Sequence, residues 1–432
     1  MQFSSLGLSP ALLRALERQK LHIPTNVQSQ AIPAAMAGHD AMVRAQTGSG
    51  KTLAFGLPLL HKLASEAANN PRQVRAVVLV PTRELAVQVG ETLRGLANQL
   101  PQAIKVSVVF GGVSINPQML AMRGGTDVVV ATPGRLLDLV QHNALSLSAT
   151  QMLVLDEADR LLDLGFEVEL NRLLAMLPIQ RQSLFFSATF SPAIAALANS
   201  MLREPTQVDV GTTDAAKPDI TQQAILVDAP QRTQLLRHLI NTQKWSRLLV
   251  FVATKHAAEI VADKLRKARI YAEPFHGELS QGKRSQVLSD FKASRLKVVI
   301  ATDMASRGLD ITQLPVVVNF DLPRSATEYT HRIGRTGRAG ATGLAVSFVS
   351  HETESHFRLI EKRHGLQVPM EIVAGFEPTE QPLVPAMEPG ELGGAVKRAA
   401  STNVDPLNTG GVKGKRPNKK DKLRALAGQQ GR

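Results

Sequence analysis

Short apolar runs alternate with segments of helical pattern along most of this 432-residue chain, and this alternation limits its fold more than any other feature. The segment from Thr82 to Leu100 is one of the helical stretches between such runs. Alternation of this kind is typical of βαβ units around a parallel sheet, so the chain is expected to be an α/β protein. The expected strands are AMVRA, RAVVLV, KVSVVF, DVVVA, MLVLD and SLFFSA, followed by QAILVD, RLLVFVA, LKVVIA, PVVVNF and GLAVSFV.

One break divides the alternation into two halves. The segment GTTDAAKPD contains small and turn-forming residues, and the strand runs resume after it. No sequence repeat of 20 to 50 residues joins the halves, although their architecture looks alike. We therefore predict a first domain over residues 1–210, a linker over 211–219, a second domain over 220–375, and a basic disordered tail over 376–432.

The chain is strongly basic, with 50 Lys and Arg against 37 Asp and Glu. Such an excess indicates a polyanionic partner, either nucleic acid or an anionic membrane surface, and charge alone does not choose between them. Residues 395–432 contribute ten Lys and Arg against two Asp, which is typical of a flexible RNA-binding or solubilising extension. No run approaches the roughly 18 apolar residues of a membrane span, and the N-terminus lacks a signal-peptide pattern.

The chain contains no cysteine. Disulfides and thiolate metal sites are therefore excluded. This composition fits a soluble cytoplasmic protein.

The segment AMVRAQTGSGKT places a strand before a glycine-rich turn and the start of a helix. Gly48 and Gly50 let the backbone wrap a phosphate, Lys51 neutralises it, and the Thr52 hydroxyl is placed to ligate Mg²⁺. Ala45 stands where the usual pattern begins with glycine. The alternative is a flexible Gly-Ser turn, which the order of strand, turn and helix disfavours.

A second signal is MLVLDEAD, a buried-looking strand that ends in acidic residues. We expect this strand to lie beside the phosphate-loop strand, so that Asp156 reaches the Mg²⁺ on the nucleotide's phosphates. Glu157 is then the residue that orients and deprotonates the attacking water. The alternative is that these acids only stabilise the next helix through its dipole.

The ordered series AQTGSGKT, PTRELA, TPGR, DEAD, SAT, ATDMASRGLDI and HRIGRTGR resembles the DEAD-box family of ATP-dependent RNA helicases. The resemblance extends from Phe3 to about Gly365, and the overall pattern is similar to the bacterial RhlE-like branch. It implies two tandem RecA-like domains, each a mostly parallel sheet flanked by helices. It also implies ATP, Mg²⁺ and RNA as ligands, a monomer, and partners from ribosome assembly or RNA decay.

The resemblance also assigns the nucleotide-binding residues. Gln28 of IPTNVQ would bond the N6 and N7 edge of adenine and Phe3 would stack on its ring, with Thr25 in the same motif. Lys20 and Leu21 depart from the family's usual glycine and aromatic residue. The alternative is that Thr25 is a helix cap and Phe3 a core residue. The phosphate loop comprises Gln46, Thr47, Gly48, Ser49, Gly50, Lys51 and Thr52.

The motifs of the second half supply the remaining groups. HRIGRTGRAG taken alone fits a solvated charge run, but the resemblance makes Arg335 and Arg338 arginine fingers and His331 a link to the first domain. Asp310 of SRGLD matches a position near the ribose, and Gly308 belongs to the same nucleotide-binding set.

Ser187 and Thr189 of SAT match family positions that bond Asp159 at the end of DEAD, with helix capping as the alternative.

The RNA positions carry hydroxyls, backbone amides or single arginines, which bind phosphates without reading bases. One Trp and two Tyr leave few platforms for base stacking. Helix capping is the alternative for residues such as Thr82. The RNA set is Thr82, Arg83, Gly112, Thr132, Pro133, Gly134, Arg135, Thr254, Arg284 and Thr302.

The function expected from these assignments is RNA-stimulated ATP hydrolysis coupled to local separation of short RNA duplexes. ATP and RNA would close the two domains, each ligand tightening the other. An ATP-gated RNA clamp shares the same core residues. A DNA translocase of the same superfamily is disfavoured by the combination of DEAD with IPTNVQ, and an inactive scaffold by the presence of the expected catalytic residues.

Overall fold

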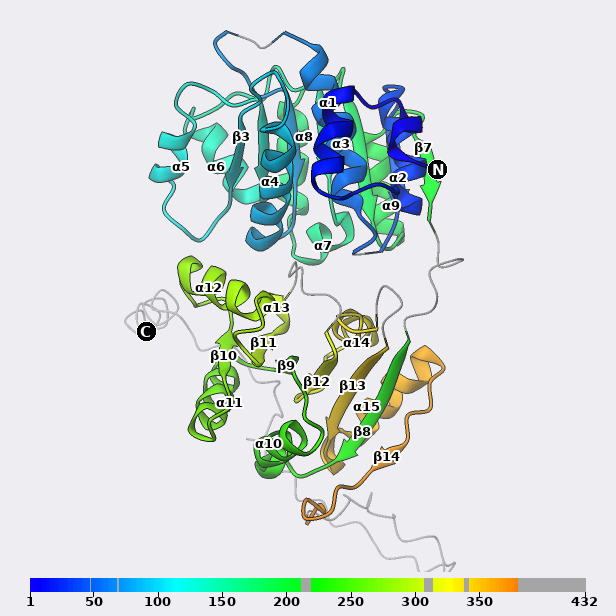
Figure 1. The fold of residues 1–432 in the computed structure, drawn as a ribbon, viewed down its shortest axis with the longest axis vertical. Helices are drawn as coiled ribbons and strands as arrows, with labels where there is room; N and C mark the ends of the chain where they lie inside the picture. Colours follow the sequence, from blue (N-terminus) through cyan, green and yellow to red (C-terminus); the bar gives the residue numbers. More distant parts are fainter. Residues whose placement is uncertain (47, 68–69, 211–218, 307–313, 338–341, 380–432) are drawn as a thin grey trace, which may run out of the picture. The chain divides into compact units, whose positions relative to one another are not determined.

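The computed structural model describes residues 1–46, 48–67, 70–210, 219–306, 314–337 and 342–379. Within them, two seven-stranded parallel sheets are each flanked by helices (Figure 1). We call the sheet formed by β1 to β7 and its helices the first lobe, and the sheet formed by β8 to β14 and its helices the second lobe. This architecture is that of two tandem RecA-like domains, as predicted; the predicted domain limits themselves stay a prediction.

The first lobe has strands of four to six residues joined by helices. Its strands are β1 (Ala41–Arg44), β2 (Ala76–Leu79), β3 (Val106–Val109), β4 (Val128–Ala131), β5 (Met152–Leu155), β6 (Gln182–Ser187) and β7 (Thr206–Asp209). Its helices are η1 (Phe3–Leu6), α1 (Pro10–Arg18), α2 (Asn26–Met36), α3 (Lys51–Ser65), α4 (Arg83–Ala97), α5 (Asn116–Ala121), α6 (Pro133–Gln141), α7 (Ala158–Asp163), α8 (Glu167–Met176) and α9 (Pro192–Met201).

The second lobe repeats the same plan. Its strands are β8 (Ile220–Leu226), β9 (Leu248–Val252), β10 (Ala272–Phe275), β11 (Val298–Thr302), β12 (Val316–Asn319), β13 (Gly343–Val349) and β14 (Met370–Glu371). Its helices are η2 (Ala229–Gln231), α10 (Arg232–Thr242), α11 (Lys255–Lys267), α12 (Gln281–Lys292), α13 (Asp303–Ser306), α14 (Ala326–Ile333) and α15 (His351–His364).

The strand order is identical in the two sheets. It is β3-β4-β2-β5-β6-β1-β7 in the first and β10-β11-β9-β12-β13-β8-β14 in the second. This order corrects one expectation: β5, which ends before Asp156, does not lie beside the phosphate-loop strand β1, because β6 pairs with both. Local sequence patterns identify strands, but pairing depends on long crossovers that they do not encode.

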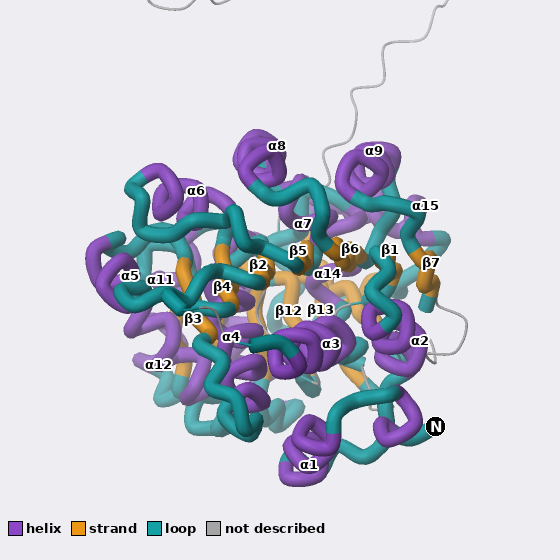
Figure 2. The backbone as a smooth tube through the Cα atoms, turned by 90° about the horizontal axis from the view of Figure 1, so that it is seen from above, coloured by secondary structure: helices purple, strands orange, loops and turns teal. Residues whose placement is uncertain are grey.

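Apart from the edge strand β7, the strands of the first sheet send alternate side chains to two separate cores. Val78 and Val154 face α2, α3 and α4, whereas Leu79 and Leu155 face α6, α8 and α9. Figure 2 shows these helices on opposite sides of the sheet. Burial on both faces explains why the strands read as continuous apolar runs instead of alternating patterns.

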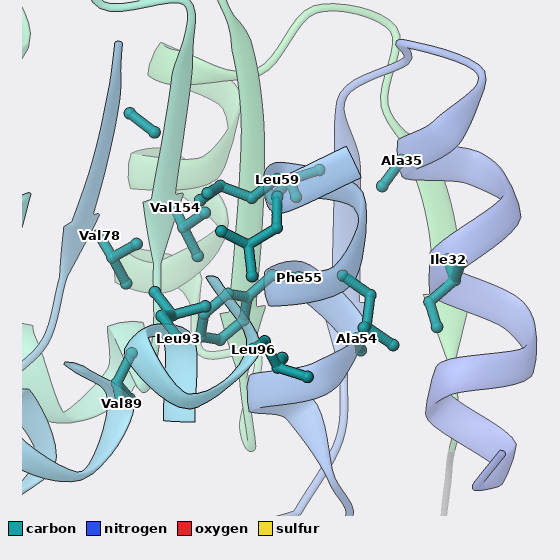
Figure 3. Close-up of a cluster of buried hydrophobic side chains, with 14 of the residues drawn as sticks. Ile32, Ala35, Ala54, Phe55, Leu59, Val78, Val89, Leu93, Leu96 and Val154 are labelled. Atoms are coloured by element: carbon teal, nitrogen blue, oxygen red, sulfur yellow. The ribbon is translucent and has the colours of Figure 1, made fainter. Parts of the chain in front are cut away.

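The packing of α3 and α4 on the sheet holds the phosphate loop at the start of α3. Phe55 and Leu59 of α3 meet Leu93 of α4 over Val78 and Val154 (Figure 3). Phe55 also contacts Phe186 of β6 edge to face, with ring centroids 5.4 Å apart. Close packing of α3 on the sheet and on α4 therefore fixes the position of its first turn.

The second lobe extends past the predicted start of the tail. Phe376 packs against His238 of α10, and the Thr379 amide and hydroxyl both donate to Asp228. A short anchor that follows β14 thus packs on the second lobe beyond the predicted start of the tail, and the predicted limits themselves stay a prediction. No helix in the described parts of the chain is long and apolar enough to cross a membrane.

Two glycines of α4 provide a test of this packing. A Cβ at Gly90 would lie 2.1 Å from Cγ2 of Val108, whereas a Cβ at Gly95 meets nothing within 4 Å. Val108 is β-branched and stiff, so we expect Gly90→Ala to destabilise the protein by about 1–3 kcal/mol. Gly95→Ala is the matched control, and it should be neutral or stabilising by up to about 1 kcal/mol. Urea unfolding of the full chain measures both, and equal midpoints would contradict the proposed close approach.

Candidate nucleotide and nucleic-acid site

The phosphate loop connects β1 to α3. Gly48 and Gly50 have φ angles of 83° and 91°, in the left-handed region that favours glycine. Lys51 is the first residue of α3 and is 5% exposed, and its Nζ donates to the carbonyl of Ala45 at 3.1 Å. The ammonium group thus points into the loop where a phosphate would lie.

The other loop residues were predicted in the same motif. The Ser49 hydroxyl donates to the Gln46 carbonyl at 2.8 Å, and Thr52 lies half-buried in the first turn of α3. Thr47 lies outside the described residues.

Asp156 follows β5 and is buried, with 2% of its surface exposed. Among the described residues, its Oδ1 has no hydrogen-bond partner. Burial raises the pKa of this carboxyl to about 6; Lys51 opposes the shift, and Glu157 and Asp159 add to it. A buried carboxylate oxygen without a donor fits a cation, and Mg²⁺ is usually held by one or two carboxylates together with phosphate oxygens.

Glu157 has a left-handed backbone, with a φ angle of 53°. This conformation is uncommon for a residue with a side chain, and it occurs at sites where function requires a fixed direction. The Glu157 carboxylate accepts from Arg160 Nη1 at 2.7 Å, and both side chains are buried. Arg160 was not predicted, although its place directly after DEAD was the available signal.

The adenine motif is bonded to the phosphate loop. Gln28 is 3% exposed; its Oε1 accepts from the Thr25 amide at 2.9 Å and its Nε2 donates to the Gly50 carbonyl at 3.0 Å. The Thr25 hydroxyl donates to the Ser49 carbonyl at 2.8 Å. A Cβ at Gly50 would lie 2.4 Å from Gln28 Nε2, so this contact also requires glycine.

Phe3, predicted to stack on adenine, is buried. Its ring is 4% exposed and belongs to the hydrophobic core of the first lobe. A ring buried in this way offers no free face to adenine. The structure therefore does not confirm the stacking role of Phe3 and places it as a core residue.

Asp159 links the DEAD segment to SAT. Its Oδ2 accepts from the amides of Ala188 and Thr189, both at 3.1 Å, and from the Thr189 hydroxyl at 3.2 Å. The predicted bond to Thr189 is confirmed. The predicted bond to Ser187 is wrong, since the Ser187 hydroxyl donates to the Thr189 carbonyl and so shapes the turn instead.

In the second lobe, α14 carries His331 and is followed by Arg335, which is 6% exposed. Burial, and then the charges of Arg160 and Arg335, lower the pKa of His331 below its usual value. An imidazole in this setting is neutral at pH 7. The predicted residues Arg338, Gly308 and Asp310 lie outside the described parts of the chain.

Arg332 is a buried organising residue that the sequence reasoning missed. Its guanidinium bonds both carboxylate oxygens of Asp303 at 2.6 Å, the Asn319 side chain and the Asp321 carbonyl, and it lies over the Phe251 ring. It thus fixes the last turn of α14 against β9, α13 and β12. Arg332 lies within HRIGRTGR, but nothing in that motif distinguishes it from the other arginines.

Most predicted RNA positions lie at the carboxyl ends of strands, where helices begin. Thr82 and Thr254 are the N-cap residues of α4 and α11, and their hydroxyls accept from Leu85 and Ala257 amides at 3.3 and 3.1 Å. Thr132 precedes α6 and accepts from the Gly111 amide, so all three threonines act as helix caps or turn supports. Pro133 and Gly134 form the first turn of α6, and Thr302 ends β11.

Arg83 lies directly against Gly112, whose φ angle is 76°. A Cβ at Gly112 would lie 2.3 Å from Arg83 Nη2, so glycine leaves the space for this guanidinium. The pair brings a cation and an open backbone segment together at the end of β3, which suits a phosphate.

Two predicted RNA arginines are engaged within the protein. Arg135 is 7% exposed and donates to the Val113 carbonyl at 2.7 Å. Arg284 is 5% exposed, donates to the His276 carbonyl at 2.9 Å and lies over the Phe275 ring. Both arginines thus donate within the protein, although Arg135 Nε has no hydrogen-bond partner among the described residues, and their role as phosphate ligands stays a prediction.

Comparison with known proteins decides the family. Residues 25–197 match the family model of the DEAD/DEAH box helicases, and residues 231–340 match that of the helicase conserved C-terminal domain. The chain is 38% identical over 369 residues to the ATP-dependent RNA helicase DDX47 of Drosophila melanogaster, covering 85% of this chain and 72% of that protein. The chain belongs to the DEAD-box helicase family.

Other DEAD-box proteins agree with this assignment. The DEAD-box ATP-dependent RNA helicase CshA of Geobacillus kaustophilus is 38% identical, over 83% of this chain and 76% of that one. The structure of Saccharomyces cerevisiae Dbp5 bound to RNA and ADP BeF3 matches with a TM-score of 0.73 and 30% identity, over 88% of this chain and 96% of that one. Membership of the RhlE-like branch stays a prediction.

The raised pKa of Asp156 has a consequence for stability. Between the ordinary pKa of 3.8 and the folded value of about 6, the folded protein holds a proton that the unfolded chain has lost, so stability falls as pH rises through this window. Without nucleotide or metal, Asp156→Asn should therefore be more stable than the wild type at pH 7.5 by of the order of 1–3 kcal/mol. The difference should vanish near pH 4.

Thermal unfolding of the full chain at several pH values measures this difference. Asp163→Asn removes an exposed carboxylate at the end of α7 and serves as the matched control. A stability difference for Asp156→Asn that is the same at pH 4 and pH 7.5 would contradict the assignment.

Proposed function

We propose that this DEAD-box protein is an ATP-dependent RNA helicase that binds RNA without reading its sequence and separates short duplexes locally. The observation that carries this proposal is the buried Asp156 carboxylate, which has an oxygen without a donor and lies within the electrostatic influence of Lys51. Mg²⁺ would balance the negative charge of Asp156, and nucleotide phosphates would balance the positive charge of Lys51. The RNA-bound Dbp5 structure supports RNA as the second ligand.

The first lobe supplies the nucleotide-binding groups. The amides of the phosphate loop and Lys51 bind phosphate oxygens, and Gln28 senses the base while it holds the loop. Asp156 and the Thr52 hydroxyl are the residues that would hold Mg²⁺, which when bound neutralises negative charge on the phosphates.

Glu157 is the general base for the attacking water. The ion pair with Arg160 at 2.7 Å and the left-handed backbone fix the direction of its carboxylate. The water oxygen bonds to the γ-phosphorus while the bond from that phosphorus to the bridging oxygen breaks and ADP leaves. Glu157 takes the water proton and passes it to solvent. The Glu157 carboxylate is thus held in position before ATP and RNA bind.

The second lobe contributes positive charge. Arg335 and Arg338 stabilise the negative charge that develops on the transferred phosphate, and His331 helps to couple the two lobes. Because the required groups are divided between the lobes, hydrolysis requires ATP and RNA to bring the lobes together. RNA therefore promotes turnover through its greater affinity for the closed state.

The RNA contacts are to the phosphate backbone. Thr82, Thr132 and Thr254 stand at helix N-termini, where free amides bind phosphates, and Arg83 adds a cation beside Gly112. These groups do not read base edges. Closure that bends the bound strand displaces its partner over a short duplex and needs no translocation.

Strand displacement tests the proposal. The full chain with ATP should separate a short RNA duplex, and its ATPase should be stimulated by RNA and not by DNA of the same sequence, since the 2′-hydroxyl distinguishes them. Glu157→Gln should keep nucleotide affinity and lower turnover by about 10²–10⁴-fold. Glu167→Gln, an exposed carboxylate of α8, is the matched control.

The outcomes separate the functions. Duplex separation that fails while ATP still locks the protein on RNA would favour an RNA clamp. Equal stimulation by DNA would contradict RNA as the substrate, and near-normal turnover in Glu157→Gln would remove Glu157 from its role.

The basic tail gives a further prediction. Deleting residues 380–432 keeps the anchor formed by Phe376 and Thr379, and it removes ten Lys and Arg. RNA affinity at low salt should fall. The slope of log affinity against log salt concentration should become less steep by about 0.7 for each lost phosphate contact. The ATPase rate at saturating RNA should be unchanged, and an unchanged RNA affinity would show that the tail has no binding role.

A further inference from the structure

A hollow of about 510 Å³ lies at the amino edge of the second sheet, where β9, β10 and β11 begin. The turns that follow α10, α11 and α12 form it. Thr254 and Thr302 lie at the opposite, carboxyl edge, about 15 Å away for strands of this length. The hollow is therefore separate from the nucleotide and RNA positions described above.

The hollow gathers rare aromatic residues. The chain has one Trp and two Tyr. Trp245 and Tyr271 both line the hollow, whereas Tyr329 is buried and bonded to Gln222. Trp245 is 7% exposed, but Tyr271 is 77% exposed and therefore contributes little to the core.

Cations line the same hollow as the exposed ring. Lys244, Arg295 and Lys297 line the same hollow. The Lys297 amide donates to the Tyr271 carbonyl, and the Leu248 amide donates to the Lys297 carbonyl, so Tyr271, Lys297 and Arg247 lie in one row before the three strands. Arg247 lies over the Phe291 ring.

Negative charge at this surface is small. Asp290 bonds Arg295 at 2.7 Å and compensates that cation. Within the described residues, Lys244 and Lys297 have no ion-pair partner. Interaction with the carboxyl ends of α10 and α12 accounts for cations at this edge. It does not account for an exposed tyrosine among them.

We propose that this hollow is a second contact surface for single-stranded RNA, an inference that rests on the proposed function. Tyr271 stacks on a base, and Lys244 and Lys297 bind the phosphates on either side of it. An aromatic platform flanked by cations is the arrangement that holds single strands without reading their sequence. The surface lengthens the RNA that one molecule holds, and it leaves the chemistry at the carboxyl edge unchanged.

Binding of short and long RNA to the full chain tests this surface. The variants are Tyr271→Ala, Tyr271→Phe and the double change Lys244→Glu with Lys297→Glu. The matched control is Arg172→Glu with Lys362→Glu, which alters exposed cations on α8 and α15 by the same charge. Affinity for an 8-nucleotide and a 30-nucleotide single strand is measured by fluorescence anisotropy at several salt concentrations.

We expect Tyr271→Ala and the double lysine variant to weaken binding of the long strand by about tenfold, with little effect on the short one. Tyr271→Phe should bind as the wild type does, since the ring remains. For the lysine variant, the slope of log affinity against log salt concentration should become less steep by about 1.4, which corresponds to two phosphate contacts. Photo-crosslinking of the wild type to the long strand should label the peptide that contains Tyr271.

Equal affinities of all variants for the long strand, or the absence of that crosslink, would overturn the proposal. An unchanged RNA affinity together with weaker binding of poly-glutamate would instead identify a surface for acidic protein segments, and it would equally overturn the RNA assignment. The proposed function fails separately, if the wild type shows no ATPase stimulation by RNA. Normal turnover of the variants at saturating short RNA shows that they are folded.

Discussion

Asp156 is a carboxylate that the first lobe buries without giving one of its oxygens a donor, and the nucleotide site depends on this constraint. Burying such a group costs free energy, and its pKa of about 6 expresses that cost. Lys51 supplies part of the compensating charge from the start of α3. Because β6 lies between β5 and β1, the two groups approach each other from strands that are not neighbours in the sheet.

The second lobe has the same strand order, but its corresponding carboxylate is fully hydrogen-bonded. In its identical strand order, β8 takes the place of β1 and β12 that of β5. Arg232 begins α10 as Lys51 begins α3, and Asp321 follows β12 by two residues. Arg232 bonds Asp321 directly at 2.9 Å, and the other oxygen of Asp321 accepts from the Ala253 amide at 2.8 Å. A carboxylate satisfied in this way has little affinity left for a metal. At this position of the second lobe, the described residues therefore form a closed ion pair where the first lobe has the Asp156 oxygen without a donor.

The strands were largely predictable because β-branched and apolar runs mark buried parallel strands, and all eleven expected runs are strands. The three missed strands lack that signal: β7 reads TQVD, β14 has two residues, and β10 contains Pro274. Both β7 and β10 lie at sheet edges, where polar residues and proline are tolerated. The motif residues of the site were also predictable, as their types suit phosphate and metal. The partners of Arg332, Arg284 and Glu157 were not, because a sequence pattern indicates that a residue is charged but not which distant group it will meet.

Under the proposed function, the bond from Gln28 to Gly50 connects recognition of the base to the state of the phosphate loop. In the described structure, the Gln28 carboxamide uses one N–H on the Gly50 carbonyl and one oxygen lone pair on the Thr25 amide. A carboxamide has a second N–H and a second lone pair, which are the donor and the acceptor that the N7 and N6 edge of adenine requires. A bound adenine therefore orients the same group that holds the loop, and it favours the loop conformation in which the Gly50 carbonyl is engaged. Under this proposal, a base without that pair of groups would orient Gln28 less firmly, and selectivity for ATP would act on the phosphate loop as well as on the base.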